Sequence, residues 1–202
     1  MTVTTVCLVR HGETDWNLHR RYQGWEDIPL NETGFGQAQV VALAIADEQW
    51  DVIASSPLSR AYATAQAIAA ASRMSNTNAI VTDVDLRERG YGDAEGMTLE
   101  ERTAQWPGND WPNLEAYDVL ADRAMAALDR LVTAYPGQRI LVVCHGGLIN
   151  AVLARVSGGE VGTGKTIILN TARSFLTYRA GLWSIDVVTD ASHLELEAAL
   201  KH

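Results

Sequence analysis

The chain has few cysteines and no long apolar run. Its 202 residues include only two cysteines, Cys7 and Cys144, and both lie inside short apolar segments. Because buried thiols of this kind behave as small apolar side chains, we expect them to be free, in a reducing compartment. The apolar runs are too short to cross a membrane, and the first residues lack the basic and apolar segments of a signal peptide. We therefore expect a cytoplasmic protein with no membrane partner.

Positive charge is also scarce. The sequence has 16 lysines and arginines against 25 aspartates and glutamates, which gives a net charge of -9. A general nucleic-acid binder needs a basic face, so this balance argues against a nucleic-acid partner. It is compatible with a small phosphorylated substrate, since a few local arginines outweigh a distant acidic surface. The sequence does not indicate which substrate is the natural one.

Repeats, linker-like segments and metal-ligand spacings are absent as well. The scattered histidines and cysteines do not have the spacing of metal ligands, so we expect no metal and no cofactor. A hydrophobic content of 47% and a charged content of 20% are ordinary for a globular protein. We expect a single domain over residues 1–202, with residues 83–117 as a lid. The sequence leaves open whether the chain forms a homo-oligomer.

Short apolar runs alternate with longer amphipathic stretches, which is typical of an α/β fold. Asn31 is a suitable cap for the first long helix, and Pro57 is tolerated in the first turn of the second. The expected strands cover 3–9, 51–55 and 79–81 and a run that ends at Cys144. Apolar runs near 166–170, 173–179 and 182–188 predict a late strand and a hairpin around Ala180-Gly181. The expected helices cover 33–48, 56–71, 98–105, 115–134 and 147–156, and a short helix is expected after Ser192.

Two of the apolar runs end at a histidine that is followed by glycine. The first run leads into Arg10-His11-Gly12, and the second leads into His145-Gly146. The carboxyl ends of parallel strands are the places where ligands bind to an open α/β sheet. If the two strands are neighbours, the two imidazoles meet although they are far apart in the sequence. An arginine beside the first histidine favours an anionic ligand, so the pattern predicts phosphate chemistry.

Phosphoryl transfer needs a nucleophile, positive charge near the phosphate oxygens and an acid for the leaving group. A neutral imidazole is a competent nucleophile if its other ring nitrogen is held by an acceptor. His11 has the best position for this role, because the planar guanidinium of Arg10 beside it matches phosphate oxygens. Arg60 follows a predicted strand end, and His145 precedes a predicted helix N-terminus, so both can contact the same anion.

The acid for the leaving group is not fixed by the sequence pattern. The irregular segment Leu86–Gly96 contains three candidate carboxyl groups, which belong to Glu88, Asp93 and Glu95. Their spacing does not distinguish them, so all three stay candidates from the residues alone.

The segment Gly159–Thr166 offers a different kind of phosphate site. It matches the phosphate-binding Walker pattern letter by letter. Such a loop should follow a strand and open a helix, whereas here a predicted helix precedes it and the strand-like run Ile167-Ile168-Leu169 follows. A nucleotide-binding protein acting through this segment is therefore a remote alternative.

Several motifs together resemble the histidine phosphatase superfamily, which is also called the phosphoglycerate-mutase-like family. Arg10-His11-Gly12-Glu13-Thr14 is similar to the family signature, and Ser55–Ala61 and Val142–Gly147 are similar to later blocks. Further matches are Trp16-Asn17, Arg21, Gly24-Trp25, Asp27, Leu30, Thr33-Gly34, Gln37-Ala38, Thr64-Ala65, Leu86-Arg87-Glu88, Gly92 and Glu95-Gly96. The blocks come in the family's order and span residues 8–147, which makes the resemblance specific. It implies a three-layer sandwich, in which helices flank a mostly parallel central sheet and a lid covers the C-terminal strand ends.

The resemblance also implies roles for individual residues. His11 matches the family's nucleophile, and Glu88 matches its proton donor. The matches to its phosphate ligands are Arg10, Arg60 and His145, and the matches to substrate-binding positions are Asn17, Arg21, Gln23, Gly24 and Gly146. One departure affects the roof of the pocket: members often carry Gly-Glu-Ser before the long helix, and this chain has Leu114-Glu115-Ala116.

The function implied by the resemblance is that of a metal-independent phosphomonoesterase. Such an enzyme hydrolyses small phosphorylated metabolites through a phosphohistidine intermediate. A cofactor-dependent phosphoglycerate mutase, with the same first half-reaction, is the alternative. The family's mutases carry a long basic insertion after the acid block, whereas the short segment 97–117 here has one basic residue, Arg102. We therefore expect hydrolysis to dominate.

Overall fold

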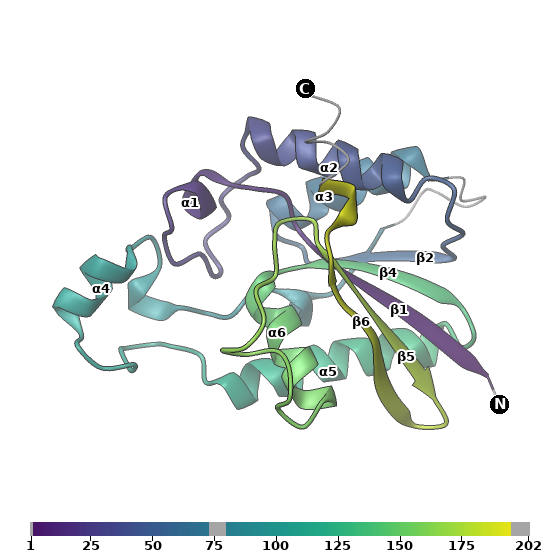
Figure 1. Cartoon of the computed structure of the whole chain (residues 1–202). Coiled ribbons are helices and arrows are strands. Elements are labelled where there is room, and N and C mark those ends of the chain that lie inside the picture. Colours follow the sequence, from purple (N-terminus) through teal and green to yellow (C-terminus); the bar gives the residue numbers. More distant parts are fainter. Residues whose placement is uncertain (1, 73–79, 195–202) are drawn as a thin grey trace.

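A six-stranded sheet runs through the middle of the molecule (Figure 1). The computed structural model describes residues 2–72 and 80–194. The strands are β1 (Val3–Arg10), β2 (Val52–Ser55), β3 (Val81–Thr82), β4 (Arg139–Cys144), β5 (Arg173–Arg179) and β6 (Leu182–Asp190). They lie in the order β3-β2-β4-β1-β5-β6. The first four are parallel, β5 is antiparallel to β1, and β6 is antiparallel to β5, so the sheet is mostly parallel.

Helices cover both faces of this sheet. The α-helices are α1 (Asp15–Leu18), α2 (Glu32–Ala44), α3 (Ser59–Ala71), α4 (Leu99–Gln105), α5 (Tyr117–Ala134) and α6 (Gly146–Val156), and 3-10 turns cover Val84–Leu86 and Gly92–Ala94. In Figure 1, α2 and α3 lie on one side of the sheet, and α5 and α6 lie on the other. The resulting helix–sheet–helix layers confirm the predicted fold class.

The central strands are apolar because both of their faces are covered. Successive side chains of β1 point to opposite faces, so Val6 and Leu8 join the core under α5 and α6, whereas Cys7 and Val9 join the core under α2 and α3. Both thiols are free and buried, and burial raises the pKa of Cys7 and of Cys144 above the ordinary value. These cysteines are therefore packing groups in this fold.

The strand expected at 166–170 is wrong. Residues 166–169 have no regular secondary structure, because β1 already pairs with β4 on one side and β5 on the other. Ile167 is 78% exposed and Leu169 is 48% exposed, and only Ile168 between them is buried. The Walker-like segment Gly159–Thr166 follows α6 and leads into this irregular stretch, so no helix follows it. The strand–loop–helix context of a nucleotide-binding loop is not present there.

Several element boundaries also differ from the predicted ones. The short helix α1 is not predicted by apolar periodicity, because a capping box at Thr14 starts it rather than an apolar stripe. α2 ends at Ala44 instead of reaching residue 48, and α3 begins at Ser59 because residues 56–58 form a turn. The third strand is Val81–Thr82, and Ala79 of the expected strand lies outside the described residues. Of the expected last helix, residues 192–194 are helical, and residues 195–202 are outside the described part.

Residues 83–117 lie beyond the carboxyl ends of the parallel strands. In Figure 1 this segment, which contains α4, extends away from the sheet on the same side as α1. Aromatic contacts hold it to the α1 side: the Tyr22 ring centroid lies 5.1 Å from that of Tyr91 and 5.6 Å from that of Trp111. Within the described ranges, no helix combines the length and apolar character needed to span a membrane.

Candidate active site

The ends of β1 and β4 bring the two histidines together, as the sequence predicts. Arg10 is in register with Cys144, and the His11 N–H donates to the Cys144 carbonyl oxygen at 3.0 Å. His11 and His145 therefore leave the sheet at the same edge, and their ring centroids are 5.1 Å apart. Both side chains are buried, with exposed fractions of 2% and 0%.

The His11 ring is held in one orientation. Its Nδ1 lies 2.6 Å from the carbonyl oxygen of Gly12, so Nδ1 carries the proton and donates it there. The lone pair of Nε2 is then free. The Gly12 N–H donates to the Thr64 hydroxyl, and that hydroxyl donates to the Arg60 carbonyl oxygen, which ties the end of β1 to α3. Gly12 also packs against Gly34: a Cβ at Gly12 would lie 2.4 Å from the Gly34 carbonyl oxygen, so only glycine fits.

The His145 ring is oriented by Ser56. Its Nε2 lies 2.8 Å from the Ser56 hydroxyl oxygen, and that oxygen accepts the N–H of Leu58. The Ser56 hydroxyl can donate its proton to Nε2, and in that tautomer the ring proton of neutral His145 sits on Nδ1. This Nδ1 is buried and has no hydrogen-bond partner.

Two arginines, the buried Arg60 and the half-buried Arg10, surround the histidines without forming an ion pair with a described carboxylate. Arg60 is 0% exposed, and its guanidinium donates to the carbonyl oxygens of Gly24 at 2.7 Å and Glu26 at 2.9 Å. The Arg10 guanidinium donates to the Ile168 carbonyl oxygen at 2.7 Å. In the part of the chain that the structure describes, neither arginine forms a salt bridge. Buried positive charge normally has a counter-charge in contact with it, and here the nearest carboxylates, such as Glu88, act only from beyond ion-pair distance, so an anion in contact with these groups is favoured.

Burial and the two guanidinium groups also set the charge of the imidazoles. The pKa of His11 and of His145 is lowered well below 6.5, chiefly by burial and then by the positive charge of Arg60 and Arg10. Both rings are therefore neutral at neutral pH, as a nucleophilic His11 requires. Burial lowers the pKa of Arg60 to about 10, which still leaves it charged.

Within the described part of the chain, four buried donors in and around this cluster have no acceptor. They are Nε of Arg10, Nε of Arg60, Nδ1 of His145 and Nε2 of Gln23. An unsatisfied buried donor costs about 1–3 kcal/mol, so a ligand that accepts these protons is favoured. A group with several negatively charged acceptor oxygens, such as a phosphate, meets both the charge and the hydrogen-bonding demand.

The Glu88 carboxylate sits at the N-terminus of α6. One oxygen accepts the Gly147 N–H at 2.9 Å, and the other accepts the N–H groups of Leu148 at 3.0 Å and Arg89 at 2.8 Å. A helix N-terminus supplies free N–H groups and a partial positive charge, which explains this placement. A Cβ at Gly147 would lie 2.5 Å from a Glu88 oxygen, so glycine is required for the contact.

The other two candidate acids face away from the pocket. Asp93 accepts a hydrogen bond from the Asn113 side-chain amide, and Glu95 accepts the N–H groups of Trp25 and Glu26. Neither carboxylate lines the pocket, whereas Glu88 does. The geometry thus separates three candidates that spacing in the sequence does not distinguish.

Glu115 and Arg123 form an ion pair that supports the backbone of Glu88. Glu115 belongs to the segment Leu114-Glu115-Ala116, which departs from the family pattern, and Arg123 belongs to α5. The Glu115 carboxylate bonds Arg123 at 2.7 Å and accepts the Gly90 N–H at 2.9 Å. Arg123 in turn donates to the Glu88 carbonyl oxygen at 2.7 Å. Glu115, the residue that this chain shares with the family's Gly-Glu-Ser, therefore helps to fix the backbone of Glu88 through Arg123.

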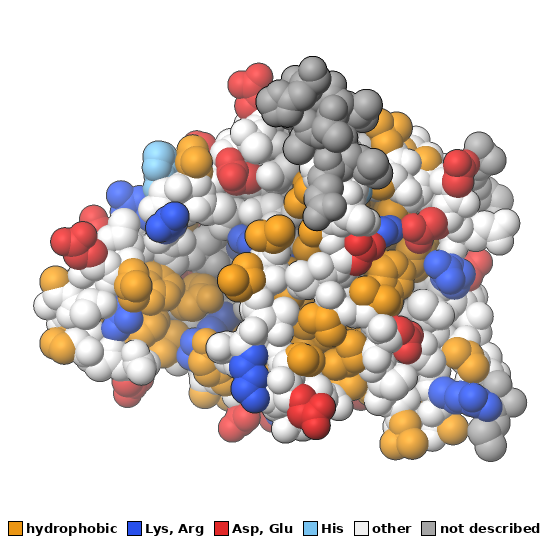
Figure 2. Space-filling view, in the orientation of Figure 1, with side chains coloured by type: hydrophobic (Ala, Val, Ile, Leu, Met, Phe, Trp, Pro, Cys, Tyr) orange, Lys and Arg blue, Asp and Glu red, His pale blue; other side chains and the backbone are white. Residues whose placement is uncertain are grey.

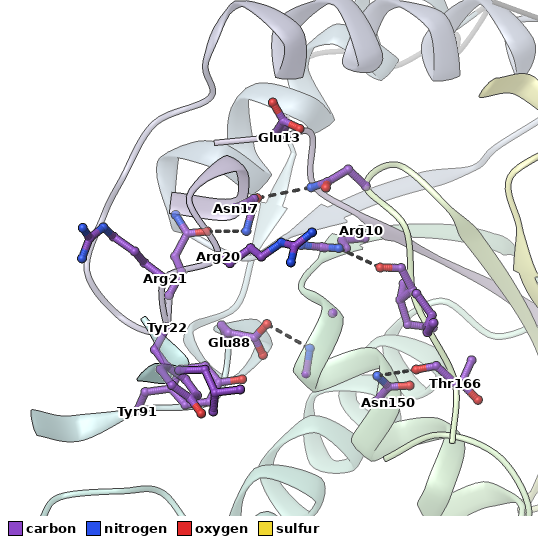
Figure 3. Close-up of a pocket in the computed structure, with 17 residues that line it drawn as sticks. Arg10, Glu13, Asn17, Arg20, Arg21, Tyr22, Glu88, Tyr91, Asn150 and Thr166 are labelled. Atoms are coloured by element: carbon purple, nitrogen blue, oxygen red, sulfur yellow. Dashed lines mark hydrogen bonds between the residues drawn. The ribbon is translucent and has the colours of Figure 1, made fainter. Parts of the chain in front are cut away.

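A cavity of about 570 Å³ opens above the cluster (Figure 3). In Figure 2 it lies in the hollow between the α1–α4 side of the molecule and the loop after α6. Six of the predicted site residues line it: Arg10, Asn17, Arg21, Gln23, Glu88 and Gly146. His11, Arg60, Gly24 and His145 are buried behind this lining. Within the described ranges, no group of three or more His, Cys, Asp or Glu side chains is arranged to hold a metal ion.

The predicted substrate-binding side chains differ in whether their donor groups are already hydrogen-bonded within the protein. The Asn17 amide donates to the Gln23 side-chain oxygen at 3.1 Å, which leaves the Gln23 amide nitrogen without a partner and free for a ligand. Arg21, in contrast, donates to the Gly96 carbonyl oxygen at 2.6 Å and to Glu101 at 3.2 Å. Arg21 thus connects the α1 side to α4 while it lines the pocket.

A turn before β5 completes the site and is missed by sequence reasoning. The Asn170 side-chain amide donates to the His11 carbonyl oxygen at 3.0 Å. The Thr171 N–H donates to the Arg10 carbonyl oxygen at 3.0 Å, and its backbone has a left-handed φ of 60°. The Thr171 hydroxyl oxygen lies 3.0 Å from Nε2 of His193, near the end of the described chain. No motif marks these residues, because their role depends on the pairing of β5 with β1.

The lowered imidazole pKa values predict that acid weakens the fold below pH 6.5. In the unfolded chain the histidines take up protons with a pKa near 6.5, whereas buried His11 and His145 do not. Because the unfolded state then binds more protons, the free energy of unfolding falls as the pH decreases. The slope approaches about 1.4 kcal/mol per pH unit for each imidazole. Urea denaturation between pH 7.5 and pH 5 measures it.

A His11→Gln variant should show a shallower slope than the wild type by about one imidazole. His19→Gln provides the matched control, because His19 is exposed and lies outside this cluster. An unchanged slope in His11→Gln would mean that burial does not keep this ring neutral.

The comparisons with known proteins agree with this geometry. The family model described as "Histidine phosphatase superfamily (branch 1)" matches residues 6–191. The chain is 44% identical over 192 residues to PhoE of Bacillus subtilis, described as an uncharacterized phosphatase, with 95% of this chain and 97% of PhoE covered. It is 39% identical to phosphoglycerate mutase-like protein 4 of Arabidopsis thaliana, covering 94% and 86% of the two chains.

Among solved structures, YhfR of Bacillus stearothermophilus superposes with a TM-score of 0.84 at 28% identity, covering 95% of this chain and 99% of YhfR. The family match spans both histidine blocks, the acid block and β5, which are the segments that build the site. The chain therefore belongs to the histidine phosphatase superfamily.

Proposed function

We propose that this protein is a metal-independent phosphomonoesterase that hydrolyses small phosphorylated metabolites through a phosphohistidine at His11. One observation carries the proposal: the buried guanidinium of Arg60 and the half-buried guanidinium of Arg10, neither in an ion pair with a described carboxylate, surround a neutral imidazole whose Nε2 is free. The arginines supply the positive charge over the phosphate oxygens, and the imidazole supplies the nucleophile. Phosphatases among the similar proteins support the same reaction class.

In the first half-reaction, Nε2 of His11 attacks phosphorus as the bond to the leaving oxygen breaks. Arg10, Arg60 and Nδ1–H of His145 bind the three other phosphate oxygens and stabilise the charge that develops there. The leaving alkoxide takes a proton from the protonated Glu88 side chain and departs as the alcohol.

In the second half-reaction, water attacks phosphorus of the phosphohistidine and the phosphorus–nitrogen bond breaks. The Glu88 carboxylate takes one proton from this water, which restores the acid for the next cycle. Inorganic phosphate leaves, and His11 returns to its neutral form. The hydrogen bond from Nδ1 to the Gly12 carbonyl oxygen keeps Nε2 directed at phosphorus in both steps.

The mutase alternative is favoured by the names of several relatives, among them phosphoglycerate mutase-like protein 4 and the probable phosphoglycerate mutases GpmB of Yersinia, and it is opposed by the composition of segment 97–117. A mutase must hold a bisphosphate while it excludes water, and this needs further positive charge near the site. Arg102 is the one basic residue in segment 97–117, and it is buried with its guanidinium bonded to the carbonyl oxygens of Trp106 and Gly108. It is not free to bind a second phosphate.

Replacing the nucleophile should abolish turnover. His11→Ala should lose all measurable phosphatase activity, because no other side chain offers an oriented lone pair at this position. Wild-type enzyme quenched during turnover should carry one acid-labile, base-stable phosphate, and His11→Ala should carry none. The matched control is His19→Ala at the exposed end of α1, which should keep wild-type activity. Substantial turnover in His11→Ala would reject the mechanism.

Removing the proposed acid should affect poor leaving groups most. Glu88→Gln should slow the hydrolysis of alkyl phosphates by on the order of 10²-fold or more, and that of p-nitrophenyl phosphate far less. The reason is that an alkoxide needs a proton to leave, whereas nitrophenolate does not. Asp93→Asn serves as the control and should change neither rate. Equal losses on both substrates, at an unchanged melting temperature, would make Glu88 a structural residue.

The balance between hydrolysis and isomerisation distinguishes the two candidate functions. Incubation with 3-phosphoglycerate and a 2,3-bisphosphoglycerate primer should give no efficient conversion to 2-phosphoglycerate, because segment 97–117 contributes no free basic side chain to retain a bisphosphate. Phosphate release and product isomers can be followed in one reaction by phosphorus NMR. Rapid isomerisation with negligible phosphate release would establish the mutase and leave the phosphohistidine chemistry intact.

A further inference from the structure

Arg20 lines the pocket with a guanidinium that has no partner. Its side chain is exposed, and Figure 3 shows it extending into the middle of the pocket in the direction of Arg10. Among the described residues, no side chain or carbonyl group accepts a hydrogen bond from the Arg20 guanidinium, and no carboxylate pairs with it. A cation in this position is available to a ligand.

The other arginines of the pocket lining are already engaged. Arg10 bonds the Ile168 carbonyl oxygen and belongs to the phosphate cluster, and Arg21 bonds the Gly96 carbonyl oxygen and Glu101. Arg20 therefore differs from its neighbour Arg21, although the two are adjacent in the sequence. The side chain of Arg20 is the free one.

The backbone of Arg20 has a conformation that glycine adopts more easily. Its φ is 53°, at the point where α1 ends: the Arg20 N–H donates to the Asn17 carbonyl oxygen, and the Arg21 N–H donates to the Trp16 carbonyl oxygen. Helices that end in this way usually have glycine or asparagine at the left-handed position. An arginine there carries a conformational cost and gains no contact within the described structure. Such an outlier suggests a function for the side chain.

We infer that Arg20 binds a carboxylate on the leaving group of the substrate, so that this pocket selects phosphate esters of hydroxycarboxylic acids. The inference rests on the proposed phosphatase function. A single free guanidinium matches one carboxylate through two parallel hydrogen bonds. Glu13 also lines the pocket and opposes a leaving group with more negative charge, such as a second phosphate.

The rest of the pocket wall suits a carbon chain between the two anionic ends. Leu99 is 60% exposed and Ile167 is 78% exposed, and both line the cavity together with Tyr22 and Tyr91. The volume of about 570 Å³ leaves room for an organic group beside the phosphate. Apolar side chains at the mouth of the pocket gain contact when such a chain enters.

The test uses matched phosphate esters that differ only at the far end of the alcohol. Linear substrates of three, four and six carbons carry a terminal carboxylate, a hydroxymethyl group or an ammonium group. The length series is included so that one member spans the distance from the phosphate to Arg20. The measured quantity is kcat/KM for each ester, with p-nitrophenyl phosphate as a substrate that does not need Arg20.

The main variant is Arg20→Gly, because glycine suits the left-handed backbone and should leave the melting temperature unchanged or raised. Wild type should prefer the best-fitting carboxylate ester over its neutral partner, and Arg20→Gly should lose about tenfold of that preference, as for one charged hydrogen-bonded contact. Arg20→Glu should invert the preference toward the ammonium ester. Arg179→Ala is the charge-matched control at the far end of the sheet, where Arg179 is exposed and in register with Val3.

The outcomes separate this inference from the function on which it rests. If wild type hydrolyses none of the esters, including p-nitrophenyl phosphate, the phosphatase proposal fails. If wild type hydrolyses them without a carboxylate preference, or if Arg20→Gly keeps that preference in full, Arg20 has no role in selection. An equal loss in Arg179→Ala would also overturn the inference, since it would indicate an effect of net charge alone.

Discussion

The burial of positive charge without a negative partner is the constraint that organises this molecule. Arg60 is inaccessible to water and bonded only to main-chain oxygens of Gly24 and Glu26, while Arg10 reaches a main-chain oxygen from the opposite side. Carbonyl dipoles orient a guanidinium without neutralising it. The loops that carry these oxygens are themselves held by the sheet and by α3, and a bound anion would be the first negative group in direct contact with both guanidinium groups among the described residues.

The same charge explains the state of the two imidazoles. A histidine next to an arginine and away from water loses its proton, so the charges that are proposed to bind phosphate also keep the proposed nucleophile, His11, neutral. Ser56 and the Gly12 carbonyl oxygen then decide which ring nitrogen faces the ligand, one ring offering a lone pair and the other a proton. One set of contacts thus accounts for the positive charge of the cluster, the neutral state of the two imidazoles and the orientation of their rings.

The sequence predicts the parts of the site that lie on regular elements. Apolar runs ending in histidine place His11 and His145 on neighbouring parallel strands, because strand direction and covered faces leave a visible pattern. Glu88 is different. Its position depends on main-chain N–H groups of α6, which are distant in the sequence and identical in every helix, so spacing alone does not separate it from Asp93 and Glu95. The strand expected around Ile167 is wrong for a related reason. The run is as apolar as a strand, but β1 already pairs with β4 on one side and with β5 on the other, which the sequence pattern does not show.

The turn at Thr171 has a consequence for the order in which activity arises during synthesis. Every residue proposed to act in catalysis lies at or before position 145, yet the main chain of Arg10 and His11 is held by residues 170–172. His193, beyond the last strand, contacts Thr171 in turn. A nascent chain that ends before residue 170 contains all of these side chains, but it lacks the contacts that hold the main chain of Arg10 and His11. Residues 170–172 must therefore be in place against β1 before Arg10 and His11 are held as the structure shows them.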